Sequence, residues 1–237
     1  MDFLEDILKQ TTIEERDGRK VVIKIYRKET GIVKWFIIKS LSLPLQLYPF
    51  TFMARERMRR EIDFFQSRPG GVLTPEIYDV NWSELYIVRE YVEGEWFNYK
   101  DKAEVYRDVA KTIARIHESG YALGDSKFTN FLRSSKGIYV VDAEQSIPSR
   151  DKNHMAWDLL VLLITLYHIV ITNKPFIIPK EFLNKMKEFL KTYIEEYDLE
   201  PVEKVIKNVK LRTVIHVLLP PLQGYWFVKV FKDLQKK

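Results

Sequence analysis

The stretch Gly124-Asp125-Ser126-Lys127-Phe128-Thr129-Asn130-Phe131 decides the fold that we predict for this chain. Asp125 and Asn130 lie five positions apart in this loop. A polar turn then leads into a short apolar strand, residues 138–141, which is followed at once by Asp142. Because the turn folds that strand back beside the loop, we expect two carboxylates and one amide to converge at one rim.

Oxygen-rich side chains of this kind suit Mg²⁺, which keeps several waters and shares the phosphate oxygens of a nucleotide. The order Asp-x-x-x-x-Asn, followed by a strand that leads into Asp, is also the signature of a protein-kinase catalytic loop and its metal-binding aspartate. The sequence therefore predicts a magnesium and nucleotide site built from Asp125, Asn130 and Asp142. A capped polar turn without chemistry is the alternative for these three residues.

At these residues the chain resembles the protein-kinase-like superfamily, in its small atypical branch. The loop that opens with Gly124-Asp125 is similar to the loops of lipopolysaccharide core heptose kinases, of the small kinase in the KEOPS tRNA-modification complex and of RIO kinases. Ordinary protein kinases carry Arg-Asp there. Asp142-Ala143-Glu144 replaces the usual Asp-Phe-Gly and is similar to the Asp-x-Glu of choline kinases and their aminoglycoside-phosphotransferase relatives.

The resemblance implies an α+β, protein-kinase-like fold with two lobes. Residues 1–92 would form a small β-rich N-lobe with one helix and an apolar insertion at 32–53. Residues 93–237 would form a mostly helical C-lobe, and the two lobes would make one catalytic unit. The apolar run 155–171 fits the buried central helix of such a C-lobe, in which Asp158 would hold the backbone of the catalytic loop.

The same resemblance assigns roles to the residues of the loop. Asp125 would accept or orient the proton of the acceptor hydroxyl, and Lys127 would stabilise charge on the transferred phosphoryl group. Asn130 and Asp142 would bind Mg²⁺, with Glu144 as a further ligand or a supporting contact. The implied cofactors are ATP and Mg²⁺.

A lysine and a glutamate upstream complete the expected phosphate site. Asp17-Gly18 predicts a hairpin, and Lys24 lies on its second strand, where kinases carry the phosphate-binding lysine. Glu61 falls on the apolar face of a helix predicted over residues 52–66, where a carboxylate needs a partner. Taken alone, Lys24 would more often be an exposed strand residue. Together with the loop, it is the partner that we expect for Glu61.

The strand predicted at 84–92 resembles the one that enters the hinge of a kinase. By that resemblance the Glu90 carbonyl and the Val92 amide would bind adenine. Arg89 would lie behind the base, where a large cation is unexpected. The chain also departs from the kinase pattern, because no glycine precedes Gly18 and the Gly-rich phosphate loop is lacking.

The overall charge and two unusual segments bear on partners. A net charge of +5 favours anionic partners such as nucleotides, nucleic acid or an anionic membrane face, and the absence of cysteine excludes disulfides and thiolate zinc sites. The acidic start lacks the order of a signal peptide, so we expect a cytoplasmic protein. Segments 32–53 and 213–237 are aromatic and basic, which favours peripheral contact with the inner membrane face. Packing onto the lobes is the alternative for both.

These observations predict an ATP- and Mg²⁺-dependent kinase that moves the γ-phosphoryl group to a hydroxyl acceptor, either a sugar- or lipid-linked group or a protein Ser/Thr. One alternative is a KEOPS- or RIO-like kinase or ATPase that acts with RNA, for which the basic helix around Arg57 and Arg60 is the feature to test. We otherwise expect the arginines of this helix to form a solvated face. The missing Gly-rich loop motivates a third hypothesis, a catalytically weak pseudokinase that serves as an interaction or membrane-surface module.

Overall fold

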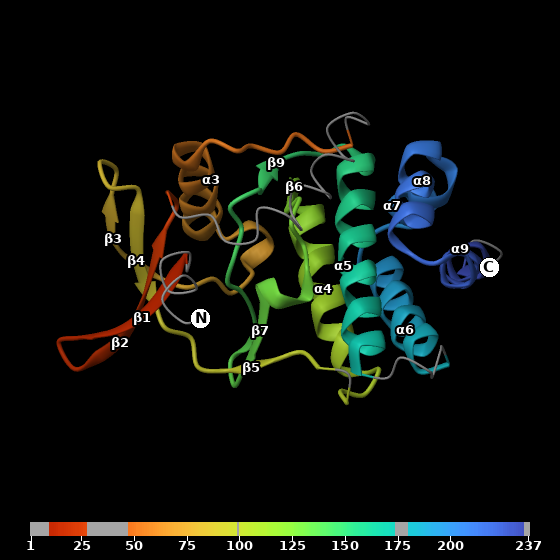
Figure 1. The fold of residues 1–237 in the computed structure, drawn as a ribbon, viewed down its shortest axis with the longest axis horizontal. Coiled ribbons are helices and arrows are strands. Elements are labelled where there is room, and N and C mark those ends of the chain that lie inside the picture. Colours follow the sequence, from red (N-terminus) through yellow and green to blue (C-terminus); the bar gives the residue numbers. More distant parts are fainter. Residues whose placement is uncertain (1–9, 28–46, 99, 174–179, 235–237) are drawn as a thin grey trace.

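The computed structural model describes residues 10–27, 47–98, 100–173 and 180–234 (Figure 1). Its strands are β1 Thr11–Arg16, β2 Arg19–Ile25, β3 Ile77–Asn81, β4 Tyr86–Glu90, β5 Glu95–Trp96, β6 Tyr121–Ala122, β7 Phe131–Ser134, β8 Gly137–Val140 and β9 Ile147–Pro148. Its helices are α3 Ala54–Ser67, α4 Val105–Glu118, α5 Lys152–Asn173, α6 Lys180–Glu196, α7 Glu200–Lys207, α8 Val209–Leu218 and α9 Pro221–Leu234, with 3₁₀ turns at Pro69–Gly71 and Phe128–Asn130. This α+β arrangement, a strand-rich lobe beside a helical lobe, is the one that the sequence predicts.

An antiparallel sheet in the order β1-β2-β4-β3 forms the smaller lobe. Asp17 and Gly18 join β1 to β2 with φ angles of 51° and 71°, the left-handed geometry that a tight hairpin needs. The register places Lys24 opposite Ile87 and Val22 opposite Arg89. Because β2 and β4 are the inner strands, these positions lie in the middle of the sheet.

Helix α3 covers this sheet with one apolar face. Met58 and Ile62, one turn apart on the helix, pack with Tyr26 and Ile87 in a buried cluster. This packing therefore fixes the position, relative to the sheet, of the polar residues on the same face of α3, which include Glu61.

Strand β3 is shorter than the sequence pattern indicates. The apolar pattern of residues 73–80 favours a strand that starts at Leu73, but β3 begins at Ile77. Pro75 has no N–H to give to a ladder, which ends the pairing there. Leu73 instead forms an isolated parallel bridge with Tyr139, and its carbonyl accepts from Val140 N at 2.9 Å. The residues that lead into the sheet are thus tied to β8, the strand that leads to Asp142.

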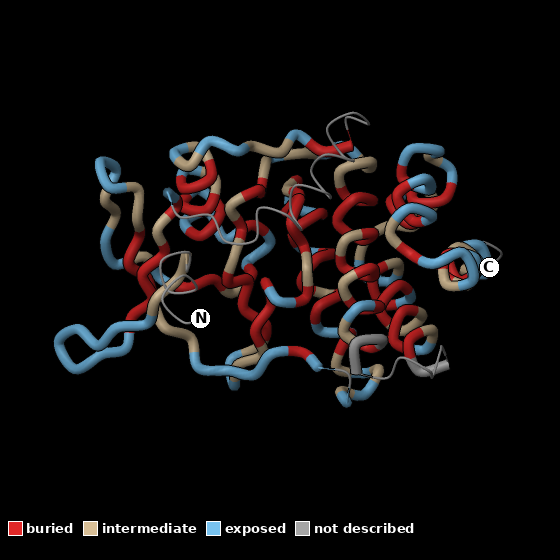
Figure 2. The backbone as a smooth tube through the Cα atoms, viewed as in Figure 1, coloured by how far each residue is buried: buried red, intermediate tan, exposed pale blue. Residues whose placement is uncertain are grey.

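The helical lobe is built around α4 and α5, whose residues are largely buried (Figure 2). Helix α5 carries a 19-residue stretch, Lys152–Val170, long and apolar enough to cross a membrane, but about 67% of this stretch is buried inside the protein. A helix that is apolar all round and covered by other helices is a core helix. Its packing against α6, α7 and α8 matches the central C-lobe helix predicted for residues 155–171.

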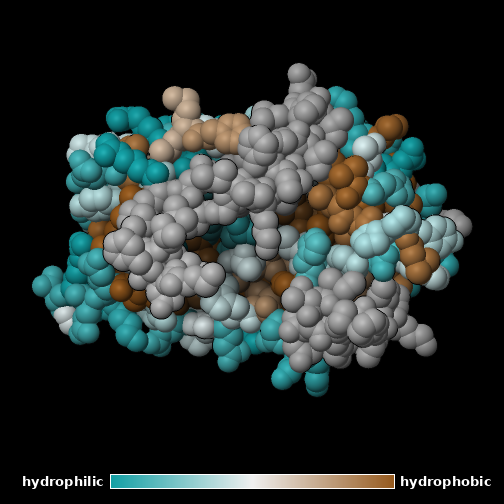
Figure 3. Space-filling view, in the orientation of Figure 1, coloured by the Kyte–Doolittle hydropathy of each residue, from teal (hydrophilic) through white to brown (hydrophobic). Residues whose placement is uncertain are grey.

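The C-terminal segment forms helices α8 and α9, which pack on this lobe. Phe227 and Phe231 of α9 are buried in the core, while Leu222 and Tyr225 are exposed. Hydrophobic surface gathers over the helical lobe, and the β1–β2 hairpin is hydrophilic (Figure 3). One face of α9 therefore packs onto the helical lobe, as the packing alternative expects. Membrane contact through 213–237 stays a prediction.

Most of the apolar insertion predicted at 32–53 lies outside the described residues, which resume at Leu47. Leu47 and Tyr48 are buried in the core of the helical lobe, and Phe50 packs edge-on against Trp157. The Tyr48 hydroxyl lies 3.0 Å from the Ala122 carbonyl and 2.9 Å from the Gln145 carbonyl. The end of this segment thus packs between the chain before the Gly124-Asp125 loop and the chain after Glu144.

We predict that Gly124→Ala destabilises the fold more than Gly18→Ala does. Both glycines have φ near +70°, so alanine costs each of them about 1 kcal/mol of backbone strain. A Cβ at Gly124 would also lie 2.6 Å from Tyr48 Cζ, whereas one at Gly18 would meet nothing within 4 Å. Steric overlap of this kind brings the total for Gly124→Ala to about 3 kcal/mol.

Urea unfolding of the two variants beside the wild type measures both free energies. Equal losses for Gly124→Ala and Gly18→Ala would show that Tyr48 does not pack against the loop.

Candidate active site

Lys24 lies at the centre of a cluster of carboxylates. Its side chain extends from β2 and is 2% exposed. Lys24 Nζ lies 2.5 Å from Glu61 Oε2 on α3, 2.9 Å from Asp142 Oδ1 and 3.4 Å from Glu144 Oε2. The predicted Lys24–Glu61 pair is therefore present, and the same ammonium group contacts both carboxylates of the segment that follows β8.

The carboxylates keep Lys24 charged. Burial alone would lower the pKa of the Lys24 ammonium, but Asp142, Glu61 and Glu144 outweigh burial and raise that pKa above its usual value. Burial pulls the pKa of Asp142 upward in turn, and the cations Lys24 and Lys127 bring it below its ordinary value. Lys24 and Asp142 therefore form an ion pair at neutral pH.

The loop from Leu123 is held in place from below by α5. Asp158 accepts from the backbone N–H groups of Leu123 at 2.6 Å and Gly124 at 2.7 Å, and Trp157 Nε1 donates to the Gly124 carbonyl at 2.7 Å. His117 supports Asp158 through its Nε2, 3.1 Å away. This is the structural role predicted for Asp158.

Asp125 and Lys127 contact each other above this support. Asp125 is 5% exposed, its Oδ2 lies 3.0 Å from Lys127 Nζ, and its Oδ1 has no hydrogen-bond partner among the described residues. Asn130 is also buried, and its Nδ2 donates to the Asp125 carbonyl at 2.6 Å. The amide of Asn130 thus closes the loop onto itself and leaves its oxygen as the group available for a ligand.

A cleft of about 310 Å³ lies between the two lobes and brings four of the eight predicted site residues together, Lys24, Val92, Asn130 and Asp142. The other four, Glu61, Glu90, Asp125 and Lys127, do not line it. Its walls are formed by Thr11, Ile13, Val22, Lys24, Arg89, Tyr91, Val92, Trp96, Thr129, Asn130, Leu132, Val141 and Asp142. Lys24 and Val92 come from the strand lobe, and Asn130 and Asp142 from the opposite side. Glu90 ends β4, with its amide bonded to the Glu76 carbonyl at 2.8 Å, and precedes the wall at Val92.

Acidic side chains at and behind the cleft wall at Asp142 form a donor set that fits a divalent cation. Glu61, Asp142 and Glu144 each offer an oxygen, and these atoms lie within 4.8 Å of one another. Lys24 already neutralises the inner side of this group, so the side that faces the cleft, with Asp142 and Asn130 in its wall, is the place for an ion. Hard oxygen donors that leave room for water and phosphate are what Mg²⁺ prefers.

Arg57 belongs to this site, and the sequence did not predict its role. It is 3% exposed, donates to the Tyr26 carbonyl at 2.8 Å and lies 3.2 Å from Glu144 Oε1. The prediction of a solvated arginine at this position is wrong. Arg57 lies four residues before Glu61 and shares its inward face of α3, a spacing that could have revealed it.

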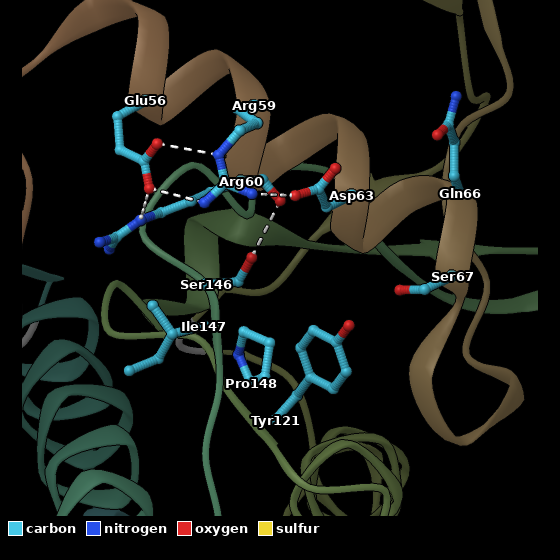
Figure 4. A pocket seen from close by; sticks show the side chains of 10 residues that line it. All are labelled: Glu56, Arg59, Arg60, Asp63, Gln66, Ser67, Tyr121, Ser146, Ile147 and Pro148. Atoms are coloured by element: carbon cyan, nitrogen blue, oxygen red, sulfur yellow. Dashed lines mark hydrogen bonds and ion pairs between the residues drawn. The ribbon is translucent and has the colours of Figure 1, made fainter.

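The neighbouring arginines of α3 are also bound by acidic side chains (Figure 4). Arg59 pairs with Glu56 and Asp63, and Arg60 pairs with Glu56, along a hollow of about 560 Å³ between α3 and the β6–β9 pair. Arg60 is only partly exposed. The basic helix proposed for RNA contact is therefore largely neutralised by its own neighbours.

Comparison with known proteins finds relatives that are named as Bud32 proteins or as bifunctional tRNA threonylcarbamoyladenosine biosynthesis proteins. No protein-family model matches the chain. The KEOPS complex subunit Bud32 of Pyrococcus abyssi is 28% identical over 128 residues, which are 51% of this chain and 54% of that protein. A probable serine/threonine-protein kinase BUD32 homolog of Archaeoglobus fulgidus is 33% identical over 128 residues, 53% of this chain and 61% of the relative.

Longer relatives and a solved structure also match. A probable bifunctional tRNA threonylcarbamoyladenosine biosynthesis protein of Methanosarcina acetivorans is 33% identical over 130 residues, 54% of this chain and 21% of that protein. The structure of WaaP in complex with acyl carrier protein aligns with a TM-score of 0.47 and 17% identity, over 94% of this chain and 83% of that one. The match spans about half the length of the first Bud32 relative and less of the bifunctional protein. The lobes, the Lys24–Glu61 pair and these relatives make the chain similar to protein-kinase-like proteins of the small atypical branch.

Proposed function

We propose that the protein is a phosphotransferase that moves the γ-phosphoryl group of a magnesium-bound nucleoside triphosphate to a hydroxyl acceptor. ATP is the donor expected from the sequence. The observation that carries the proposal is the cleft itself, which has Lys24 in one wall and Asn130 and Asp142 in the other. Lys24 contacts Asp142 directly at 2.9 Å, and these two residues line one cleft of about 310 Å³ with Asn130. A cation and two oxygen donors at the same cleft suit a bound triphosphate and its metal.

Each side chain has a task that follows from its place. Lys24 is held by Glu61 and stays charged, so it would offer a fixed positive charge to the phosphate oxygens. Asn130 and Asp142 would hold Mg²⁺, which neutralises phosphate charge when bound, and Glu144 would support Asp142 from the side of Arg57. Most of the rate gain in such transfers comes from position and charge, and these residues supply both.

Asp125 has the properties of the group that accepts the hydroxyl proton. Burial raises the pKa of its carboxyl from 3.8 to about 6, against the opposite effect of Lys127 and with a further upward contribution from Asp142. A base is most effective when its pKa lies near the working pH. Lys127, 3.0 Å away and partly exposed, is placed to contact the phosphoryl group at the same time.

A second candidate function comes from the names of the relatives. Two of the matched proteins are a KEOPS complex subunit and a tRNA threonylcarbamoyladenosine biosynthesis protein. We therefore also propose an ATPase or kinase that acts with an RNA-modifying complex. A turnover rate that rises on addition of tRNA and partner proteins, but not with small hydroxyl acceptors, would favour this candidate over the first.

We predict that the wild type turns over Mg-ATP and that two substitutions separate binding from chemistry. Asp142→Asn removes a magnesium ligand, so nucleotide binding should no longer strengthen when Mg²⁺ is added. Asp125→Asn should keep Mg-ATP binding and lower kcat by about 100-fold or more, because only proton acceptance is lost. Titration calorimetry measures the binding, and release of ADP measures turnover.

Asp233→Asn, on the exposed end of α9, is the matched control and should behave as the wild type. A wild type that binds Mg-ATP without turning it over would identify a pseudokinase, and failure to bind nucleotide at all would reject the proposal.

We predict a pH-dependent gain in stability for Asp125→Asn in metal-free buffer. The folded-state pKa lies above the unfolded value, so protonation of Asp125 favours the fold at acid pH. That contribution is lost as the pH rises from about 4 to about 6. At pH 8 the buried charge therefore costs stability, and the variant should be more stable than the wild type by about 1–3 kcal/mol.

Urea unfolding at pH 8 and pH 4 measures the effect, and the difference should vanish at pH 4. Asp198→Asn is the control of opposite sign. Partial burial opposes the charge of Asp198, but hydrogen bonds from Lys152 and the Glu200 amide lower its pKa, so this variant should lose stability at pH 8. A loss for Asp125→Asn at pH 8 would contradict the prediction.

A further inference from the structure

Arg89 lies where a bound nucleotide would place its base. It is the fourth residue of β4, opposite Val22 in the sheet, and it precedes the connection at Glu90 and Val92 between the lobes. Arg89 lines the cleft together with Val22, Val92 and Leu132. These three apolar side chains form the walls that a flat purine ring needs, and Arg89 adds a cation to them.

No hydrogen bond is found from the guanidinium of Arg89 to the part of the chain that the structure describes, although its charge acts on the Glu61 carboxyl, whose pKa is raised by burial and lowered by the charges of Lys24 and Arg89. Arg89 is 7% exposed, its Nε is buried without a hydrogen-bond partner, and its contact is with the ring of Phe65, 5.9 Å from the centroid. Two other buried cations do have acceptors. Lys24 contacts three carboxylates, and Arg57 contacts Glu144 and the Tyr26 carbonyl.

A buried cation with unused donors is costly unless a ligand supplies the acceptors. The contact with Phe65 does not meet this need. A guanidinium that lies on an aromatic face keeps its in-plane N–H donors free for a second partner. Since Arg89 also lines the cleft, a molecule bound there can supply the acceptors.

The two purines differ in what they offer to such a group. Guanine presents two acceptors side by side, O6 and N7, which match the forked donors of an arginine. Adenine presents N7 beside the N6 amino group, so a guanidinium at the same edge would place one of its N–H donors against the N–H donor of the base. The main chain at 90–92 carries both N–H and C=O groups, so it can pair with either base. The side chain that discriminates is Arg89.

We infer that the cleft takes a 6-oxopurine nucleoside triphosphate, GTP, in preference to ATP, with Arg89 as the residue that selects the base. The inference rests on the proposed function, because it assumes that a triphosphate binds between Lys24 and Asp142. It changes the expected donor and leaves the phosphate and metal contacts as described.

Competition binding to the wild-type protein in Mg²⁺ tests this directly, with GTP, ITP, 7-deaza-GTP and ATP displacing a fluorescent nucleotide. GTP and ITP share O6 and N7 and should both bind about tenfold tighter than ATP. 7-Deaza-GTP lacks N7 and should bind more weakly than GTP. This comparison needs no substitution, so it holds even if a variant at Arg89 does not fold.

Arg89→Met should bring the ratio of GTP to ATP affinity close to one by weakening GTP. Arg60→Met removes a partly buried arginine outside the cleft and should leave the ratio as in the wild type. Equal or tighter binding of ATP by the wild type overturns the inference and leaves the proposed function intact. An unchanged ratio in folded Arg89→Met also overturns it. Failure of every nucleotide to bind overturns the proposed function as well.

Discussion

The ammonium group of Lys24 is the point on which the two lobes of this protein depend. It is buried, and it remains charged only because Glu61, Asp142 and Glu144 surround it. Removing one carboxylate would weaken the attraction that offsets the cost of burying this ammonium group. Glu61 comes from α3, Lys24 from β2 and the other two from the segment after β8, so a single charge joins three parts of the fold. Arg57 extends the same arrangement, because it bonds both Glu144 and the Tyr26 carbonyl.

The other half of the site has a different kind of support, built from backbone hydrogen bonds. Asp158 binds two consecutive amides at the start of the loop, and Trp157 binds the carbonyl of Gly124. The loop therefore keeps its shape without any ligand, while Asp125 keeps one oxygen unpaired. A rigid backbone with an unsatisfied carboxylate is a costly arrangement for stability and a favourable one for catalysis. Arg89 shows the same combination, because the sheet fixes its backbone while its Nε has no hydrogen-bond partner among the described residues.

Local pattern was enough to predict the parts of the site that depend on spacing. The helical period placed Glu61 on the inward face of its helix. The apolar run around Asp158 predicted a buried helix whose aspartate holds the backbone of the loop. Features set by contacts between distant residues were not predicted. Arg57 looked like one of several surface arginines until Glu144 supplied its partner from 87 positions away. The start of β3 was misplaced because apolar residues around Pro75 suited a strand, whereas Leu73 pairs with a strand much later in the chain.

Tyr48 gives the site one further property. Its hydroxyl touches the carbonyl of Ala122, ahead of the catalytic loop, and the carbonyl of Gln145, just after the acidic segment. One phenol thus holds together the segment that leads into the Asp125 loop and the segment that follows Glu144. Any shift of the peptide around Leu47 and Tyr48 therefore reaches both segments together, so the end of the 32–53 segment is mechanically coupled to both sides of the candidate site.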